Sequence, residues 1–143
     1  MMRMHTKSLL AGLATALLMV SGPAFSETMT FKADMKGASE VPPTDSAATG
    51  TADVSLDTAT KKLSWTVTST GLSGDPTAAH FHGAAAPGAN ADPVVDISAA
   101  LTKGSADISD QQIADLQAGK WYINIHTAKF PDGEIRGQVE IAK

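Results

Sequence analysis

Two alternating segments near the C-terminus decide the fold: Trp121-Tyr122-Ile123-Asn124-Ile125-His126 and, after the turn Pro131-Asp132-Gly133, Glu134-Ile135-Arg136-Gly137-Gln138-Val139-Glu140-Ile141. In both segments apolar and polar side chains alternate, as in β-strands that bury one face. Proline presets one backbone dihedral of a turn and glycine accepts a positive one, so the tripeptide between them indicates a tight turn. The pattern predicts an antiparallel hairpin.

The same alternation recurs in shorter segments along the chain. Residues 31–36, 50–57 and 63–68 alternate at period two, and the polar link 57–62 joins the last two into a second hairpin. Residues 78–82 and 94–97 are further short strand candidates, with an exposed loop predicted over 83–93. Many short strands indicate an all-β protein, an antiparallel β-sandwich or Greek-key-like barrel.

One helix is predicted near residues 109–118. Ser109 is a suitable N-cap, and Gln112 three residues later completes a capping box. Gly119 can end the helix in a left-handed conformation. A helix of this length is expected to lie over an edge of the sheet.

The composition excludes several classes of protein. The 143 residues carry a formal charge of −4 and are 43% hydrophobic, so the chain has enough apolar residues for a core. An acidic chain lacks the basic surface that binds nucleic acid, and no nucleic-acid partner is expected. The chain has no cysteine, which excludes disulfides, thiolate metal ligands and thiol catalysis.

The N-terminus has the pattern of an export signal. Arg3 and Lys7 precede a run of 12 apolar or small residues from Leu9 to Val20, and small residues follow at Ala24 and Ser26. The run is shorter than the roughly 20 residues that cross a bilayer, so no membrane span is expected after cleavage. We predict a signal peptide over 1–26, cleaved after Ser26 with Ala24 as the competing site, and one domain over 27–143, in the periplasm or secreted.

Three histidines remain after residue 26. His80 and His82 lie two residues apart on a predicted strand, so both point to the face opposite Phe81. His126 likewise lies opposite the apolar phase of its strand. If the two strands are neighbours, the three imidazoles converge.

Converging imidazoles suit Cu(II) or Zn(II), which makes His80, His82 and His126 the candidate metal ligands. Asp75, Tyr122 and Glu134 are possible further oxygen donors or partners that orient a ring. Histidines on a sheet can also hydrogen-bond adjacent loops and bind no metal. Glu134 and Arg136 are expected to form an exposed ion pair of little energetic value.

Five motifs, in order, resemble the CHRD domain, which is named for the repeats of chordin and also occurs as single exported bacterial modules. The resemblance covers residues 31–141. Its motifs are Gly37-Ala38-Ser39-Glu40-Val41-Pro42-Pro43, Ala48-Thr49-Gly50-Thr51-Ala52, Ala79-His80-Phe81-His82-Gly83-Ala84-Ala85, Gly119-Lys120-Trp121-Tyr122-Ile123-Asn124-Ile125-His126-Thr127 and Pro131-Asp132-Gly133-Glu134-Ile135-Arg136-Gly137-Gln138. The resemblance implies an all-β sandwich-like fold and little about activity. The histidine pattern is also similar to part of the copper site of Cu/Zn superoxide dismutases, whose zinc loop and disulfide this chain lacks.

Three functions follow as hypotheses. The first is an exported module that binds a transition metal, copper before zinc, without being an enzyme. The second is a non-catalytic module that binds an unidentified protein, with structural histidines. The third is a small copper redox enzyme of dismutase type, which requires a steering charge near the metal, for which Arg136 is the candidate.

Overall fold

The computed structural model describes residues 16–19, 22 and 25–143. The segment predicted as a signal peptide, residues 1–26, lies for the most part outside these. The described chain forms eight strands, two short 3-10 helices and one α-helix: β1 (Thr28–Lys36), η1 (Gly37–Ser39), β2 (Thr49–Asp57), β3 (Lys62–Thr70), β4 (Pro76–His82), β5 (Pro93–Asp96), η2 (Ser98–Ala100), β6 (Lys103–Asp107), α1 (Asp110–Gln117), β7 (Trp121–Thr127) and β8 (Ile135–Ile141).

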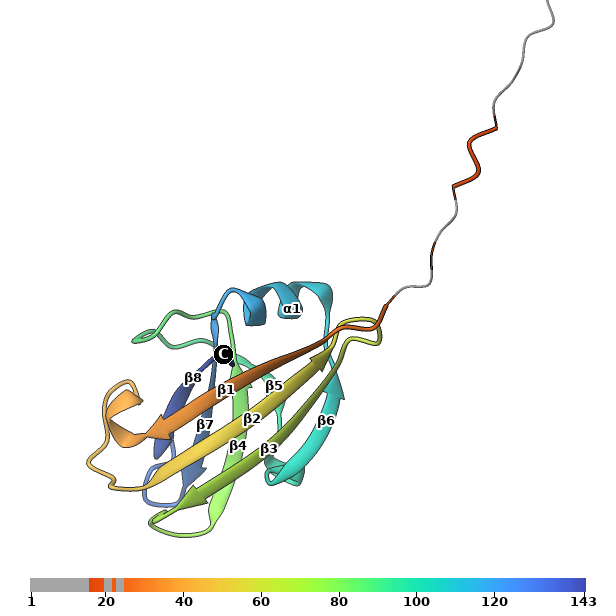
Figure 1. The fold of residues 1–143 in the computed structure, drawn as a ribbon. Helices are drawn as coiled ribbons and strands as arrows, with labels where there is room; N and C mark the ends of the chain where they lie inside the picture. Colours follow the sequence, from red (N-terminus) through yellow and green to blue (C-terminus); the bar gives the residue numbers. More distant parts are fainter. Residues whose placement is uncertain (1–15, 20–21, 23–24) are drawn as a thin grey trace, which may run out of the picture.

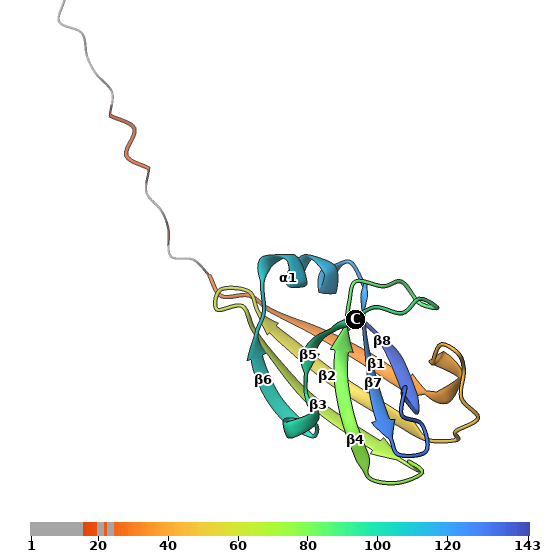
Figure 2. The same ribbon diagram turned by 180° about the vertical axis from the view of Figure 1, so that it is seen from behind.

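The strands form one antiparallel sheet in the order β5-β4-β7-β8-β1-β2-β3-β6. The sheet curls into a nearly closed barrel, with β1, β2, β3 and β6 facing β4, β5, β7 and β8 across the core (Figures 1 and 2). Both predicted hairpins, β2–β3 and β7–β8, are present. The predicted all-β antiparallel fold is confirmed.

Alternate residues along the strands point into the barrel and form the core. Along β1, Phe31, Ala33 and Met35 are buried while the residues between them are exposed. The Phe81 ring lies 5.9 Å from the Trp65 ring and 5.8 Å from the Trp121 ring, centroid to centroid, so aromatic side chains from both halves of the barrel meet. The prediction that both tryptophans are core residues is confirmed.

Helix α1 covers one end of the barrel (Figure 1). The Ser109 side chain accepts from the Gln112 backbone, and the Gln112 side chain accepts from the Ser109 backbone, which confirms the predicted capping box. Gly119 follows with φ +71°, and Leu116 is fully buried. Within the described residues, no helix has the length and apolar character needed to cross a membrane.

Strand β6 is the one strand that the sequence pattern did not predict. Lys103-Gly104-Ser105-Ala106-Asp107 has few apolar residues, and it pairs with β3 at the edge of the sheet. Gly104 lies opposite Trp65, where the indole ring occupies the space of a side chain. The packing of Trp65 therefore favours a strand here despite its weak alternation.

Candidate metal centre

The candidate centre lies on the outer face of the neighbouring strands β4 and β7. The side chains of His80 and His82 both lie on that outer face, while Phe81 between them is fully buried in the core. In the antiparallel register His80 pairs with Asn124, and His126 lies two residues further along β7. Strand phase and register thus bring the three histidines together, as the sequence predicted.

One ring nitrogen of each histidine lies within 4.8 Å of the corresponding nitrogens of the other two. Among these atoms, His80 Nδ1 lies 3.2 Å from His126 Nε2. The ring of His80 lies 5.5 Å from that of His82 and 5.1 Å from that of His126, between centroids. Three imidazoles so placed form a group that could hold one metal ion.

Two of the rings are fixed through their other nitrogen. His82 Nδ1 lies 2.9 Å from the carbonyl oxygen of Ala91, and His126 Nδ1 lies 2.8 Å from that of Pro131. A carbonyl oxygen only accepts, so each Nδ1 carries the proton and donates it. In the neutral rings the lone pair is then on Nε2, the arrangement typical of histidines that bind metals.

The third ring, that of His80, has a carboxylate beside its outer nitrogen. Its Nε2 lies 3.9 Å from Asp96 Oδ1, on the exposed side chain of the adjacent strand β5. Burial lowers the pKa of His80, the neighbouring His126 lowers it further, and Asp96 opposes both. Burial likewise lowers the pKa of His82, against hydrogen bonds to Ala91 and Asn124 that raise it. Neutral rings at pH 7 keep lone pairs available for a cation.

Asn124 lies inside the cluster. Its Oδ1 is 2.9 Å from His82 Nε2 and 3.1 Å from His126 Nε2, and the residue is 4% exposed. The amide oxygen of Asn124 therefore faces the Nε2 atoms of both His82 and His126.

Glu40 lies behind Asn124. Its side chain is buried, and its Oε1 accepts no hydrogen bond from the described residues. A Cβ added to Gly133 would overlap Glu40 Oε1 and would lie 2.7 Å from Asn124 Nδ2, so both atoms border the same point. Burial raises the pKa of Glu40 to about 7, against the opposing effects of the Arg136 charge and the Asn124 amide.

Residues 84–92 form a loop that covers this face and is held by polar contacts. The His82 ring stacks on the Tyr122 ring at 4.5 Å between centroids, and Tyr122 Oη donates to the Ala91 carbonyl at 3.1 Å. Arg136 donates to Asn90 Oδ1 at 3.0 Å and to the Ala89 carbonyl at 2.6 Å, with its guanidinium 3.4 Å from the centre of the Tyr122 ring. The loop itself is mostly exposed, as predicted, but it buries the side chains beneath it.

The expected exposed ion pair between Glu134 and Arg136 is wrong. Both residues are almost fully buried, at 0% and 2% exposure, and they have different partners. The Glu134 carboxylate accepts from the backbone and hydroxyl of Ser73 and from the Thr127 hydroxyl. Arg136, bonded to the loop and stacked on Tyr122, is not the free steering charge that the dismutase hypothesis requires.

Of the three predicted additional donors, only Tyr122 contacts a histidine, by stacking. Asp75 is exposed, and neither it nor Glu134 belongs to the group of possible ligands among the described residues. The sequence analysis missed Asn124 and Asp96 as neighbours of the histidines. Asn124 was predicted on the same face as His126, and that phase was the signal that could have identified it.

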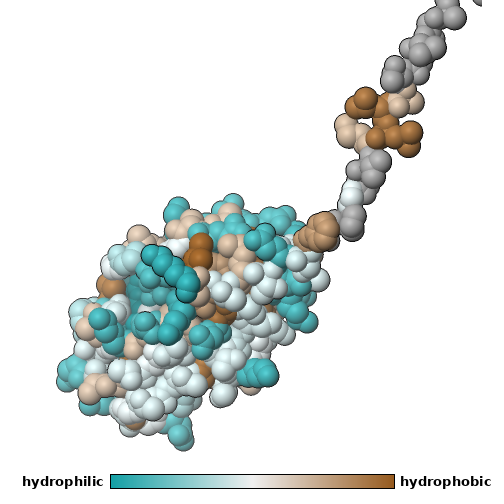
Figure 3. Space-filling view, viewed as in Figure 1, coloured by the Kyte–Doolittle hydropathy of each residue, from teal (hydrophilic) through white to brown (hydrophobic). Residues whose placement is uncertain are grey.

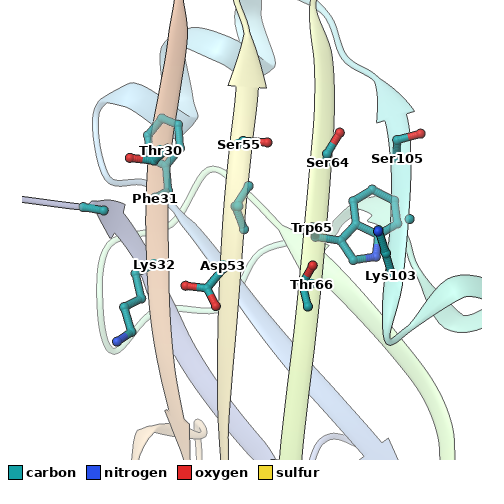
Figure 4. A pocket seen from close by; sticks show the side chains of 13 residues that line it. Thr30, Phe31, Lys32, Asp53, Ser55, Ser64, Trp65, Thr66, Lys103 and Ser105 are labelled. Atoms are coloured by element: carbon teal, nitrogen blue, oxygen red, sulfur yellow. The ribbon is translucent and has the colours of Figure 1, made fainter.

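A separate groove lies on the outer face of β1, β2, β3 and β6 (Figure 4). Hydroxyl and charged side chains line it, including Lys32, Asp53, Thr66 and Lys103. Their side chains come from the neighbouring strands β1, β2, β3 and β6 (Figure 4). The face of the barrel seen in Figure 3 is mostly hydrophilic to neutral. None of the residues that line this groove is a histidine.

Comparison with known proteins agrees with this picture of the fold. The family model of the CHRD domain matches residues 31–139, from β1 to β8, and this range includes all three clustered histidines. Neither the curated proteins nor the solved structures contain a significant match to the chain. The matched range covers most of the chain, and the protein therefore belongs to the CHRD domain family.

Proposed function

We propose that this CHRD module binds a transition-metal ion, copper before zinc, through His80, His82 and His126. The observation that carries the proposal is the convergence of three ring nitrogens, two of them on rings whose Nδ1 is fixed by a backbone carbonyl. Fixed rings lose little side-chain entropy when a metal binds, and their tautomer already suits coordination through Nε2.

Copper is favoured over zinc by the chemistry of the donors. Neutral imidazole binds both ions, and the affinity of a nitrogen site for divalent metals normally peaks at Cu(II). The chain offers no thiolate, because it has no cysteine, so a sulfur-rich Cu(I) site is not expected. The proposed cargo is therefore Cu(II), with Zn(II) as the weaker competitor.

We also propose export to the periplasm or beyond, with residues 1–26 removed and 27–143 as the mature domain. CHRD domains are typically extracellular. Strand β1 begins at Thr28, so cleavage after Ser26 would leave every strand of the sheet intact. The test is the intact mass of the protein recovered from culture medium or periplasm, which shows whether residues 1–26 have been removed. A protein retained in the cytoplasm with residues 1–26 attached would contradict this proposal.

Isothermal titration of residues 27–143 with Cu(II) and with Zn(II) tests metal binding. We expect one ion per chain, with tighter binding of Cu(II), and loss of at least a hundredfold in affinity in the His80→Ala/His82→Ala variant. Asp53→Asn, which removes an exposed carboxylate in the groove of Figure 4, serves as the matched control and should bind like the wild type. Equal weak binding by all three proteins would overturn the proposal.

A second candidate function is a protein-interaction module in which the histidines only hold loops. The hydrogen bonds from His82 to Ala91 and from His126 to Pro131 favour it, since both acceptors lie in loops beside the strands. If this function is correct, the His80→Ala/His82→Ala variant should be less stable than the wild type, and the metal content of both proteins should be near zero. The titration and an elemental analysis of the natively purified protein therefore separate the two functions.

A further inference from the structure

We propose that the side-chain oxygen of Asn124 is a fourth donor of the metal site, and that Glu40 is the positioning residue that turns this oxygen toward the histidines. The inference rests on the metal-binding function proposed above and extends its donor set from three nitrogens to three nitrogens and one oxygen.

The first support is spacing. Donors bound to one ion at about 2.0–2.1 Å are separated by about 2.8–3.4 Å in square-planar or tetrahedral geometry. Asn124 Oδ1 lies 2.9 Å from His82 Nε2 and 3.1 Å from His126 Nε2. The contact of 3.2 Å between His80 Nδ1 and His126 Nε2 falls in the same interval. The oxygen is spaced from the nitrogens as an adjacent ligand would be.

The second support is the number of protons available. A neutral imidazole has one N–H, and the Nδ1 atoms of His82 and His126 use theirs on the Ala91 and Pro131 carbonyls. Each Nε2 then presents a lone pair to an amide oxygen that also has only lone pairs. A cation between the three atoms would accept one lone pair from each of them.

The third support is the position of Glu40. Rotating the Asn124 amide by half a turn would direct its NH₂ group at the two rings and its oxygen at Glu40. The observed orientation instead places the NH₂ group, a donor, on the side of the Glu40 carboxyl, whose oxygens can accept. Glu40 is buried on the Nδ2 side of Asn124, and its Oε1 has no hydrogen-bond partner among the described residues. The position of Glu40 therefore favours the orientation in which the amide oxygen faces the histidines.

The test begins with the wild-type protein. The chain contains two asparagines, Asn90 and Asn124, and Asn90 lies in the covering loop, where it contacts Arg136. In protein with ¹³C-labelled asparagine, Zn(II) is expected to move the side-chain carbonyl resonance of Asn124 downfield and to leave that of Asn90 in place. Zn(II) that shifts the histidine resonances but not this carbonyl would overturn the inference and leave the proposed function standing. Absence of any Zn(II) or Cu(II) binding would instead overturn the proposed function.

Variants extend the test to Cu(II). Asn124→Ala should weaken Cu(II) binding about tenfold and change the electron paramagnetic resonance spectrum, while three nitrogens remain coordinated. Gln111→Ala is the matched control, because it removes an exposed amide on α1 that donates to Asp115 of the same helix. It should keep the wild-type spectrum and affinity. Identical spectra and affinities for Asn124→Ala and Gln111→Ala would overturn the assignment.

The role of Glu40 has its own signature. Glu40→Gln places an amide beside Asn124 that can present either oxygen or NH₂, so both orientations of Asn124 become accessible. We expect a mixed Cu(II) spectrum, with components like those of the wild type and of Asn124→Ala, and intermediate affinity. A purely structural role for Glu40 would change the unfolding temperature and leave the spectrum unmixed, which would contradict its role as a positioning residue.

Discussion

The Nδ1 atom of His126 lies 2.8 Å from the carbonyl oxygen of Pro131, so the turn between β7 and β8 directly fixes one candidate metal ligand. The turn ends at Gly133, which has a φ of +124° and lies against Glu40 and Asn124. A single short loop therefore links the hairpin that decides the fold to three side chains of the candidate centre.

The first prediction concerns Gly133. In Gly133→Ala the new methyl group overlaps Glu40 Oε1 and approaches Asn124 Nδ2 to 2.7 Å, and the positive φ adds strain of about 1–2 kcal/mol. We expect a total loss of about 3 kcal/mol in the free energy of unfolding and weaker Cu(II) binding. Denaturant unfolding and copper titration measure the two effects.

Gly88→Ala is the control for the strain alone. Gly88 has a similarly positive φ of +85°, but nothing lies within 4 Å of its added Cβ. It should lose only the strain of about 1–2 kcal/mol and should bind Cu(II) like the wild type. Equal effects of the two substitutions would show that contact with Glu40 and Asn124 is unimportant.

The second prediction concerns Arg136, whose guanidinium holds the covering loop at Ala89 and Asn90. In Arg136→Met the apolar stem is kept, but two partly buried hydrogen bonds and the stacking on Tyr122 are lost. We expect a loss of about 2–4 kcal/mol in stability and faster proteolysis within residues 84–92. Limited proteolysis with mass spectrometry locates the cleavage. Arg136→Lys keeps the charge but not the planar guanidinium, so its stability and its rate of proteolysis should lie between those of the wild type and Arg136→Met.

The face of the sheet on which each side chain lies was predictable, because residues two apart on a strand share a face. The alternation around Phe81 and along Trp121–His126 gave the faces of β4 and β7 correctly, and with them the convergence of the histidines. The sequence also gave the turn at Pro131–Gly133 and the cap at Ser109, since both depend on local backbone chemistry.

Burial by distant segments was not predictable in this way. Glu134 and Arg136 lie on the polar phase of β8, and the pattern therefore placed them in water. Their partners, Ser73 and Asn90, are 61 and 46 residues away in the sequence and reach them only in the folded barrel. The role of Asn124 depends in the same way on the register between β4 and β7, which no local pattern specifies.

The third prediction concerns Glu134 and pH. Burial raises the pKa of this carboxyl, but the hydrogen bonds from Ser73 and Thr127 outweigh it, so the net pKa is lowered from 4.5. A group with a lowered pKa in the folded state stabilises the fold above its ordinary pKa and loses that contribution as the pH falls. We expect stability that declines below about pH 4.5 in the wild type.

Glu134→Gln should remove part of this decline and cost about 1–3 kcal/mol at pH 7, because an amide replaces a carboxylate that accepts several hydrogen bonds. Glu140→Gln, at an exposed position on β8, is the control and should leave the pH profile unchanged. Urea unfolding from pH 3 to pH 7 gives both profiles. A steeper acid loss in Glu134→Gln than in the wild type would contradict this assignment.

The fourth prediction couples the proposed metal to stability. A ligand that binds only the folded chain stabilises it by about 2.7 kcal/mol when its free concentration is 100 times Kd. For a domain of this size that corresponds to a rise of about 10 °C in Tm. We expect Cu(II) to produce such a rise in the wild type, a chelator to reverse it, and Zn(II) to produce a smaller one. The His80→Ala/His82→Ala variant should show almost no rise in Tm, because only one histidine of the cluster remains to bind the ion. A rise of the same size in that variant would place the copper elsewhere and argue against the cluster on β4 and β7.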